Sequence, residues 1–134
     1  MSHAKEEPYT QKLQGKRILI VEDYAVIGDI ISDALRFFAQ TSQAHSGRDA
    51  LEQIEQQAPD IILLDLSLPD MNGLEVVKLV RRNEKTSRVP ILAMSGTLMN
   101  YKTCLEMGCN DFINKPFNLS TLLFQLAALI PGPI

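Results

Sequence analysis

The chain has 134 residues, a formal net charge of −3 and 46% hydrophobic residues, values typical of one soluble globular domain. The mildly acidic charge argues against nucleic-acid binding by this chain. The N-terminus lacks the apolar segment of a signal peptide, and the charge-free residues 116–134 include polar side chains and prolines, so we expect no membrane span and a cytoplasmic protein.

The first half of the chain begins with a polar, aperiodic segment, residues 1–15, which we expect to be a flexible tail. The apolar run Arg17–Val21 predicts a buried strand, and apolar residues at helical spacing over residues 27–38 predict a helix after it. A weak second strand is expected over residues 41–46. A second helix follows around residues 50–54, before Pro59.

The second half repeats this alternation of apolar runs and helical patterns. In chain order we expect three further strands at residues 61–64, 90–94 and 111–114, each followed by a helix, near residues 74–82, at 98–107 and after Asn118. Strands that alternate with helices predict an α/β fold with a parallel sheet covered on both faces. We expect a flavodoxin-like three-layer sandwich of five βα units with strand order 2-1-3-4-5. We assign residues 16–131 to this domain and 132–134 to a C-terminal end without an output domain.

Four of the expected strands end in side chains that could carry chemistry: Glu22 and Asp23, Asp65, Ser95, and Lys115. The remaining strand end, at Ser46-Gly47, offers no such group. Carboxyl ends of parallel strands share one edge of a sheet, and the order 2-1-3-4-5 makes the first and third strands neighbours, so the three carboxylates should converge. Clustered carboxylates repel one another unless a cation intervenes, and Mg²⁺ prefers such oxygen ligands. An ammonium and a hydroxyl beside them could hold a phosphoryl group next to Asp65, the candidate nucleophile.

These motifs also resemble a known family. The segment Ile18–Asp23, Asp65 with Pro69 and Gly73 after it, Ser95-Gly96 and Lys115-Pro116-Phe117 are similar to the receiver domains of two-component response regulators, of the chemotaxis-regulator type. The resemblance covers about residues 17–130. It implies that Asp65 accepts a phosphoryl group from a sensor histidine kinase or a phosphotransfer protein. The chain would then be a signalling phosphoacceptor of a phosphorelay, and it would catalyse only its own phosphorylation and dephosphorylation.

The resemblance also implies a metal site and its ligands. Asp23 and Asp65 would bind Mg²⁺ (or Mn²⁺) directly, the main-chain carbonyl of Ser67 would be a third protein ligand, and Glu22 would act largely through water. Ser67 and Thr97 occupy the two positions that tune the lifetime of the phosphoryl group in this family. Both are small, so water should reach the acyl phosphate.

The resemblance further implies a switch on the fourth helix, the fifth strand and the fifth helix. Lys115 would pair with one phosphoryl oxygen, Ser95 would hydrogen-bond another, and Phe112 would be the aromatic residue that rotates inward. The bond between Lys115 and Pro116 is expected to be cis, which an X–Pro bond permits at low cost.

The last expected helix carries no charge. We expect four residues on one of its faces to pack on the sheet: Leu122, Leu126, Leu129 and Ile130. Its other faces are also apolar, and a helix that is apolar all round is usually buried on more than one side. We therefore predict a homodimer or partner-domain interface formed by Leu123, Phe124 and Ala127.

Two other functions remain open at this point. A pseudo-receiver would be an interaction module that never takes phosphate, although the complete acidic set argues against it. A phosphatase-like hydrolase could also use Asp65 as an aspartyl nucleophile. Such hydrolases usually carry a second Asp two residues later as the acid/base, and Ser67 stands there instead.

Overall fold

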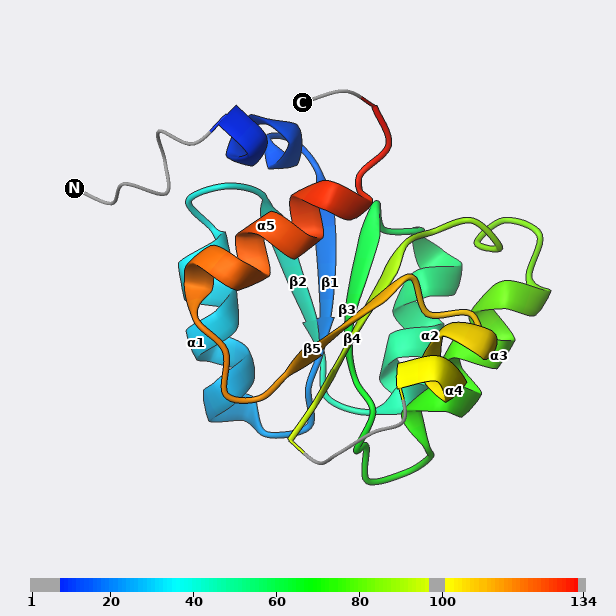
Figure 1. The fold of residues 1–134 in the computed structure, drawn as a ribbon. Coiled ribbons are helices and arrows are strands. Elements are labelled where there is room, and N and C mark those ends of the chain that lie inside the picture. The colour runs from blue at the N-terminus through cyan, green and yellow to red at the C-terminus, as the bar shows by residue number, and fades with distance from the viewer. Residues whose placement is uncertain (1–7, 97–100, 133–134) are drawn as a thin grey trace.

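The computed structural model describes residues 8–96 and 101–132, and its five strands form one parallel sheet of order β2-β1-β3-β4-β5 (Figure 1). The strands are β1 (Arg17–Val21), β2 (Gln40–Ala44), β3 (Ile61–Asp65), β4 (Ile91–Ser95) and β5 (Asp111–Asn114). The helices are the 3₁₀ helix η2 (Pro8–Leu13), α1 (Ala25–Leu35), α2 (Gly47–Gln56), α3 (Gly73–Arg82), α4 (Tyr101–Glu106) and α5 (Leu119–Leu129). The predicted flavodoxin-like α/β fold and strand order are confirmed.

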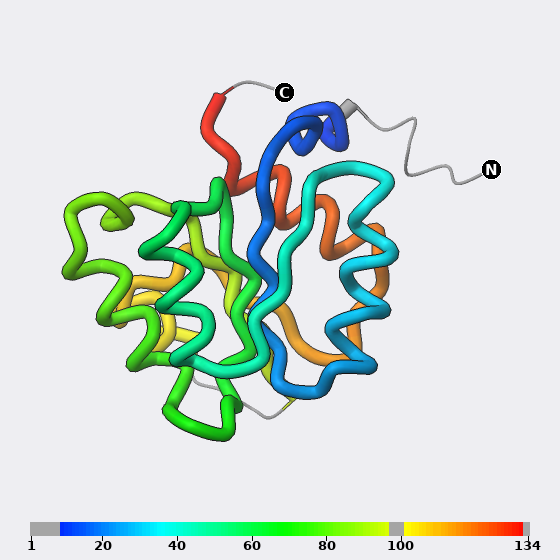
Figure 2. Tube along the Cα trace, turned by 180° about the vertical axis from the view of Figure 1, so that it is seen from behind, coloured from blue at the N-terminus to red at the C-terminus, as the bar shows by residue number. Residues whose placement is uncertain are grey.

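The sheet lies between two helical layers, with α1 and α5 on one face and α2, α3 and α4 on the other (Figures 1 and 2). Successive residues of a strand point to opposite faces, so each central strand supplies both layers. In β1, Ile18 and Ile20 join the core under α1 and α5, whereas Leu19 and Val21 join the core under α2 and α3. Burial on both faces is why β1, β3 and β4 are continuous apolar runs in the sequence.

The N-terminal segment differs from the expected flexible tail. Within residues 1–15, residues 8–13 form η2, which lies beside the end of α5 (Figures 1 and 2). Leu13 is fully buried in the core, and the ring of Tyr9 meets the ring of Phe124 edge-on, with centroids 5.6 Å apart. Tyr9 and Leu13 are only two packed residues in a short polar segment, which is too few to form a periodic apolar pattern. The sequence alone therefore does not indicate this packing.

The predicted interface on α5 is wrong for two of its three residues. Leu123 and Ala127 are 0% and 1% exposed and belong to the same core cluster as Leu13 and the α1 residues Ile31 and Leu35. Helix α5 is apolar on several faces because the sheet, α1 and η2 all pack against it. Phe124 is 56% exposed and contacts Tyr9.

Two other expectations concern the fourth helix and membrane-spanning segments. The predicted helix over residues 98–107 corresponds to α4, Tyr101–Glu106, and residues 97–100 lie outside the described part, as does the expected lifetime residue Thr97. Within residues 8–96 and 101–132, no helix is long and apolar enough to cross a membrane.

Candidate functional site

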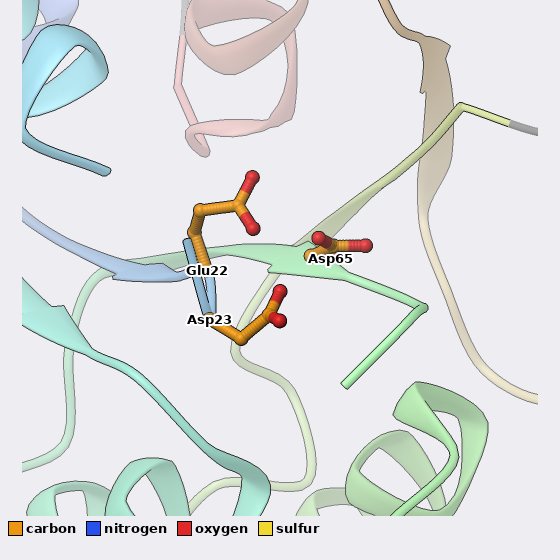
Figure 3. A group of neighbouring side chains, drawn as sticks. All are labelled: Glu22, Asp23 and Asp65. Carbon is orange, nitrogen blue, oxygen red and sulfur yellow. The ribbon is translucent and has the colours of Figure 1, made fainter. Parts of the chain in front are cut away.

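Three carboxylates meet at the carboxyl edge of the sheet. Glu22 and Asp23 follow β1, and Asp65 ends the neighbouring strand β3, as the parallel pair Val21–Leu64 shows. One oxygen from each carboxylate lies within 4.8 Å of the others, and Figure 3 shows the three side chains around a common space. Glu22 and Asp65 are buried, whereas Asp23 is exposed. The strand order therefore brings together the three acidic residues that the sequence predicts.

Lys115 extends into this acidic cluster from the end of β5. Its Nζ atom lies 2.5 Å from Glu22 Oε1 and 3.0 Å from Asp65 Oδ2. Its backbone N–H donates to the carbonyl of Ser95 at 2.8 Å, which joins the ends of β4 and β5. The peptide bond between Lys115 and Pro116 is cis, as expected. One ammonium group thus bridges two buried carboxylates at the ends of the neighbouring strands β1 and β3.

The pKa values of Glu22 and Lys115 are shifted by burial and by their contacts in this cluster. Burial raises the pKa of Glu22 to about 7, and the nearby Asp65 carboxylate adds to the rise while Lys115 opposes it. Burial alone would lower the pKa of Lys115, but its hydrogen bonds to Glu22 and Asp65 raise it overall. When all four side chains are ionised, three carboxylates and one ammonium leave two negative charges. An oxygen donor set with this excess charge fits a hard divalent cation such as Mg²⁺.

The loop after Asp65 is built to hold that carboxylate in place. The N–H of Ser67 donates to Asp65 Oδ1 at 2.8 Å, and Ser67 pairs with Asn72 in an antiparallel bridge that closes the loop. The next residue, Gly73, packs against the strand end: a Cβ added there would lie 2.5 Å from Leu66 Cα and 2.9 Å from Asp65 O. Close backbone approach therefore requires glycine at this position. Pro69 lies at the exposed side of the loop.

The remaining predicted residues lie around this cluster. Ser95 is 1% exposed at the end of β4. Phe112 is half-buried on β5 opposite Ala93, and its ring meets the ring of Tyr101 with centroids 6.3 Å apart. The switch role of Ser95 and Phe112 stays a prediction.

Two residues outside the predicted set link the acidic loops to the end of β2 and the start of α2. His45 follows β2, and its Nδ1 atom lies 3.0 Å from the main-chain oxygen of Glu22. Asp70, in the loop after Asp65, accepts backbone hydrogen bonds from Gly47 and Arg48 at the start of α2. The only sequence signal for His45 is its place at a strand end. Asp70 stands in a turn-rich segment where an aspartate is common, so no local pattern identifies it.

Comparison with known proteins agrees with this geometry. The family model of the response regulator receiver domain matches residues 18–127. The chain is 30% identical over 115 residues to the transcriptional regulatory protein TrcR of Mycobacterium tuberculosis, covering 85% of this chain and 45% of that protein. It is 29% identical over 114 residues to the chemotaxis protein CheY of Thermotoga maritima, covering 84% of this chain and 95% of that protein. The chain spans about half the length of the transcriptional regulators that it matches, at 45% and 51%.

One of the similar solved structures was determined with a metal ion. The receiver domain of a sensor histidine kinase from Pseudomonas aeruginosa, solved with a magnesium ion coordinated in its active site cleft, superimposes with a TM-score of 0.80. The two chains are 33% identical, and the match covers 87% of this chain and 98% of that one. The family match includes both acidic strand ends and all of the sheet except Arg17. This chain therefore belongs to the response regulator receiver domains of two-component signalling, which are signalling phosphoacceptors and not classical enzymes.

Proposed function

We propose that this chain accepts a phosphoryl group on Asp65 from the phosphohistidine of a sensor histidine kinase or a phosphotransfer protein in the cytoplasm. The observation that carries this proposal is the convergence of Glu22, Asp23 and Asp65 with the ammonium of Lys115 at one edge of the sheet. Such a site supplies the positioning and charge neutralisation that phosphoryl transfer requires.

The transfer uses Asp65 as the nucleophile. A carboxylate oxygen of Asp65 forms a bond to phosphorus, the N–P bond to the donor imidazole breaks, and its electron pair stays on the imidazole nitrogen. The product is an acyl phosphate, and no proton has to leave Asp65. The N–H of Ser67 holds one carboxylate oxygen at 2.8 Å, and Lys115 lies 3.0 Å from the other, near enough to pair with a phosphoryl oxygen.

A divalent cation, Mg²⁺ or Mn²⁺, belongs to this proposal. Asp23 and Asp65 would hold it directly with the main-chain carbonyl of Ser67, and Glu22 would reach it through water. When bound, the cation would neutralise charge on the phosphoryl oxygens. The buried Glu22 carboxylate is already bonded to Lys115, which supports a less direct role for it than for the exposed Asp23.

The response to phosphorylation is proposed for the surface formed by α4, β5 and α5. A phosphoryl group adds a charge of about −1.5 to −2 and strong acceptor oxygens. Ser95 and Lys115 would move towards it, and Phe112, which pairs with Ala93 of β4, would change its packing against Tyr101. Such a change selects between states that already exist in the unphosphorylated chain.

The test is incubation with acetyl phosphate and Mg²⁺, followed by intact-mass measurement. We expect a gain of one phosphoryl group in the wild type and in Asp33→Asn, a control at an exposed acid on α1. Asp65→Asn should show no gain. An unmodified wild type would favour a phosphate-independent interaction module, and steady turnover of a small phosphoester would favour a phosphatase-like hydrolase.

A further inference from the structure

The end of the edge strand β2, which offers no chemical group in the sequence, contacts both acidic loops. We call residues His45–Arg48 the β2–α2 junction. Its first residue contacts the loop after β1: since the main-chain oxygen of Glu22 can only accept, the Nδ1 atom of His45 donates to it at 3.0 Å. The N–H of Glu22 in turn donates to the carbonyl of Ala44 at 3.0 Å. The junction is thereby attached to the Glu22–Asp23 loop.

The other side of the junction is attached to the loop after Asp65 through Asp70. Asp70 Oδ1 accepts from the N–H of Gly47 at 2.8 Å, and Oδ2 accepts from the N–H of Arg48 at 2.9 Å. These N–H groups open α2 and have no acceptor within the helix, so the bidentate carboxylate satisfies both. Its negative charge also matches the positive end of the helix dipole. Ser46 caps the same helix by accepting from the N–H of Asp49.

Apolar packing fixes the same pair of segments. Met71, next to Asp70, lies over Gly47: a Cβ added to Gly47 would stand 2.5 Å from Met71 Cγ and 2.7 Å from its Sδ. Gly47 is buried under this contact. The loop after Asp65 therefore rests on the start of α2 through both a charged bidentate bond and a close side-chain contact.

We propose that Asp70 is a positioning residue for the acidic site, which acts by holding the loop after Asp65 on the β2–α2 junction. The junction is bonded to the Glu22–Asp23 loop, so this connection sets the spacing of the two loops that together form the cation site. Asp70 itself is not one of the clustered carboxylates Glu22, Asp23 and Asp65 that would hold the cation. The inference rests on the proposed function, because it concerns the geometry of the same site.

The expected effect is a weaker cation site in a folded protein. Partners that orient metal-binding groups typically change metal affinity about 10-fold to 100-fold when they are removed. For Asp70→Ala we expect the Kd for Mn²⁺ to rise about ten-fold, because the acidic loops then sample several spacings. Asp70→Asn keeps one neutral acceptor and should give a smaller rise. At saturating Mn²⁺, labelling by acetyl phosphate should return to the wild-type rate.

The experiment measures Mn²⁺ binding by electron paramagnetic resonance without any phosphate donor. The matched control is Asp60→Ala, which removes the same charge and a carboxylate that accepts from the N–H of Arg17 at 2.8 Å, at the opposite edge of the sheet. Amide exchange at Gly47 and Arg48 gives a second readout and should speed up in both Asp70 variants.

The inference is overturned if Asp70→Ala and Asp60→Ala bind Mn²⁺ with equal affinity. This holds whether or not the amides of Gly47 and Arg48 exchange faster in Asp70→Ala. If Asp70→Ala does not fold, Asp70→Asn decides by the same comparison. Absence of Mn²⁺ binding in the wild type would instead overturn the metal site of the proposed function, and this inference with it.

Discussion

Lys115 and Glu22 are joined by a contact of 2.5 Å between Nζ and Oε1, although 93 positions separate them in the sequence. The same ammonium lies 3.0 Å from Asp65 Oδ2. Glu22 is 2% exposed, so its carboxylate has given up most of its hydration for this contact. The charge balance of the site depends on the pair, since Lys115 counteracts the rise in the pKa of Glu22 that burial causes.

Lys115→Ala should therefore destabilise the metal-free protein. The variant leaves two buried carboxylates side by side without their ammonium, and we expect a loss on the order of 1 kcal/mol at neutral pH. Mg²⁺ should recover more stability in the variant than in the wild type, because a cation that binds the folded state shifts the equilibrium towards it. Urea unfolding followed by circular dichroism, with Mg²⁺ or with EDTA, measures both effects. Lys102→Ala is the control, since Lys102 is 84% exposed and lies 3.9 Å from its partner Glu106. An equal loss in the two variants would contradict the expectation.

Gly73→Ala should destabilise the fold because the added Cβ clashes with the backbone at the end of β3. The added Cβ would stand 2.5 Å from Leu66 Cα, so the strand end after Asp65 has to move. Overpacking of this kind costs about 1–3 kcal/mol. Gly96→Ala is a suitable comparison, because a Cβ there would lie 3.9 Å from Lys115 Cβ, an ordinary contact. Thermal unfolding of the two variants tests this, and a Gly73→Ala protein as stable as Gly96→Ala would show that the strand end adapts without cost.

Leu13→Ala tests whether η2 is part of the folded domain. Leu13 is fully buried with residues of α5, and removal of a buried leucine side chain costs about 2–5 kcal/mol. Gln11→Ala alters an exposed residue of the same segment and should leave the unfolding free energy unchanged. Chemical denaturation gives both values. Identical stability of the two variants would mean that the segment does not contribute to the fold.

The lowered pKa of Asp70 predicts that the free energy of unfolding depends on pH in the acid range. Backbone hydrogen bonds, first from Arg48 and then from Gly47, hold the pKa of Asp70 below its ordinary value of 3.8. For a carboxylate with a lowered pKa in the folded state, the stabilisation is complete above the unfolded pKa and disappears as the pH falls through the folded pKa. The stability advantage of the wild type over Asp70→Asn should thus be constant near neutral pH and shrink below about pH 4. Urea unfolding of both proteins across this range is the measurement, and an advantage that persists at low pH would contradict the assignment.

The sequence and the structure divide the acidic site between them. Glu22, Asp23, Asp65, Ser95 and Lys115 can be predicted because each directly follows or ends a strand, and the parallel topology forces such positions to one edge. The role of Asp70 cannot be predicted in this way. Its partners at the start of α2 lie 22 and 23 residues earlier, and only the path of the loop after β3 brings them within reach.

The same division holds for the last helix. The sequence by itself determined the order of strands and helices, since apolar runs and helical spacing are local patterns, and it determined that α5 is apolar on several faces. Only the tertiary structure decided what covers those faces: Leu123 and Ala127 lie in the core, and η2 packs beside them through Leu13. The physical reason is that the hydrophobic effect is not directional and depends on the apolar area removed from water. A sequence pattern therefore shows that an apolar face will be covered, but not which segment will cover it.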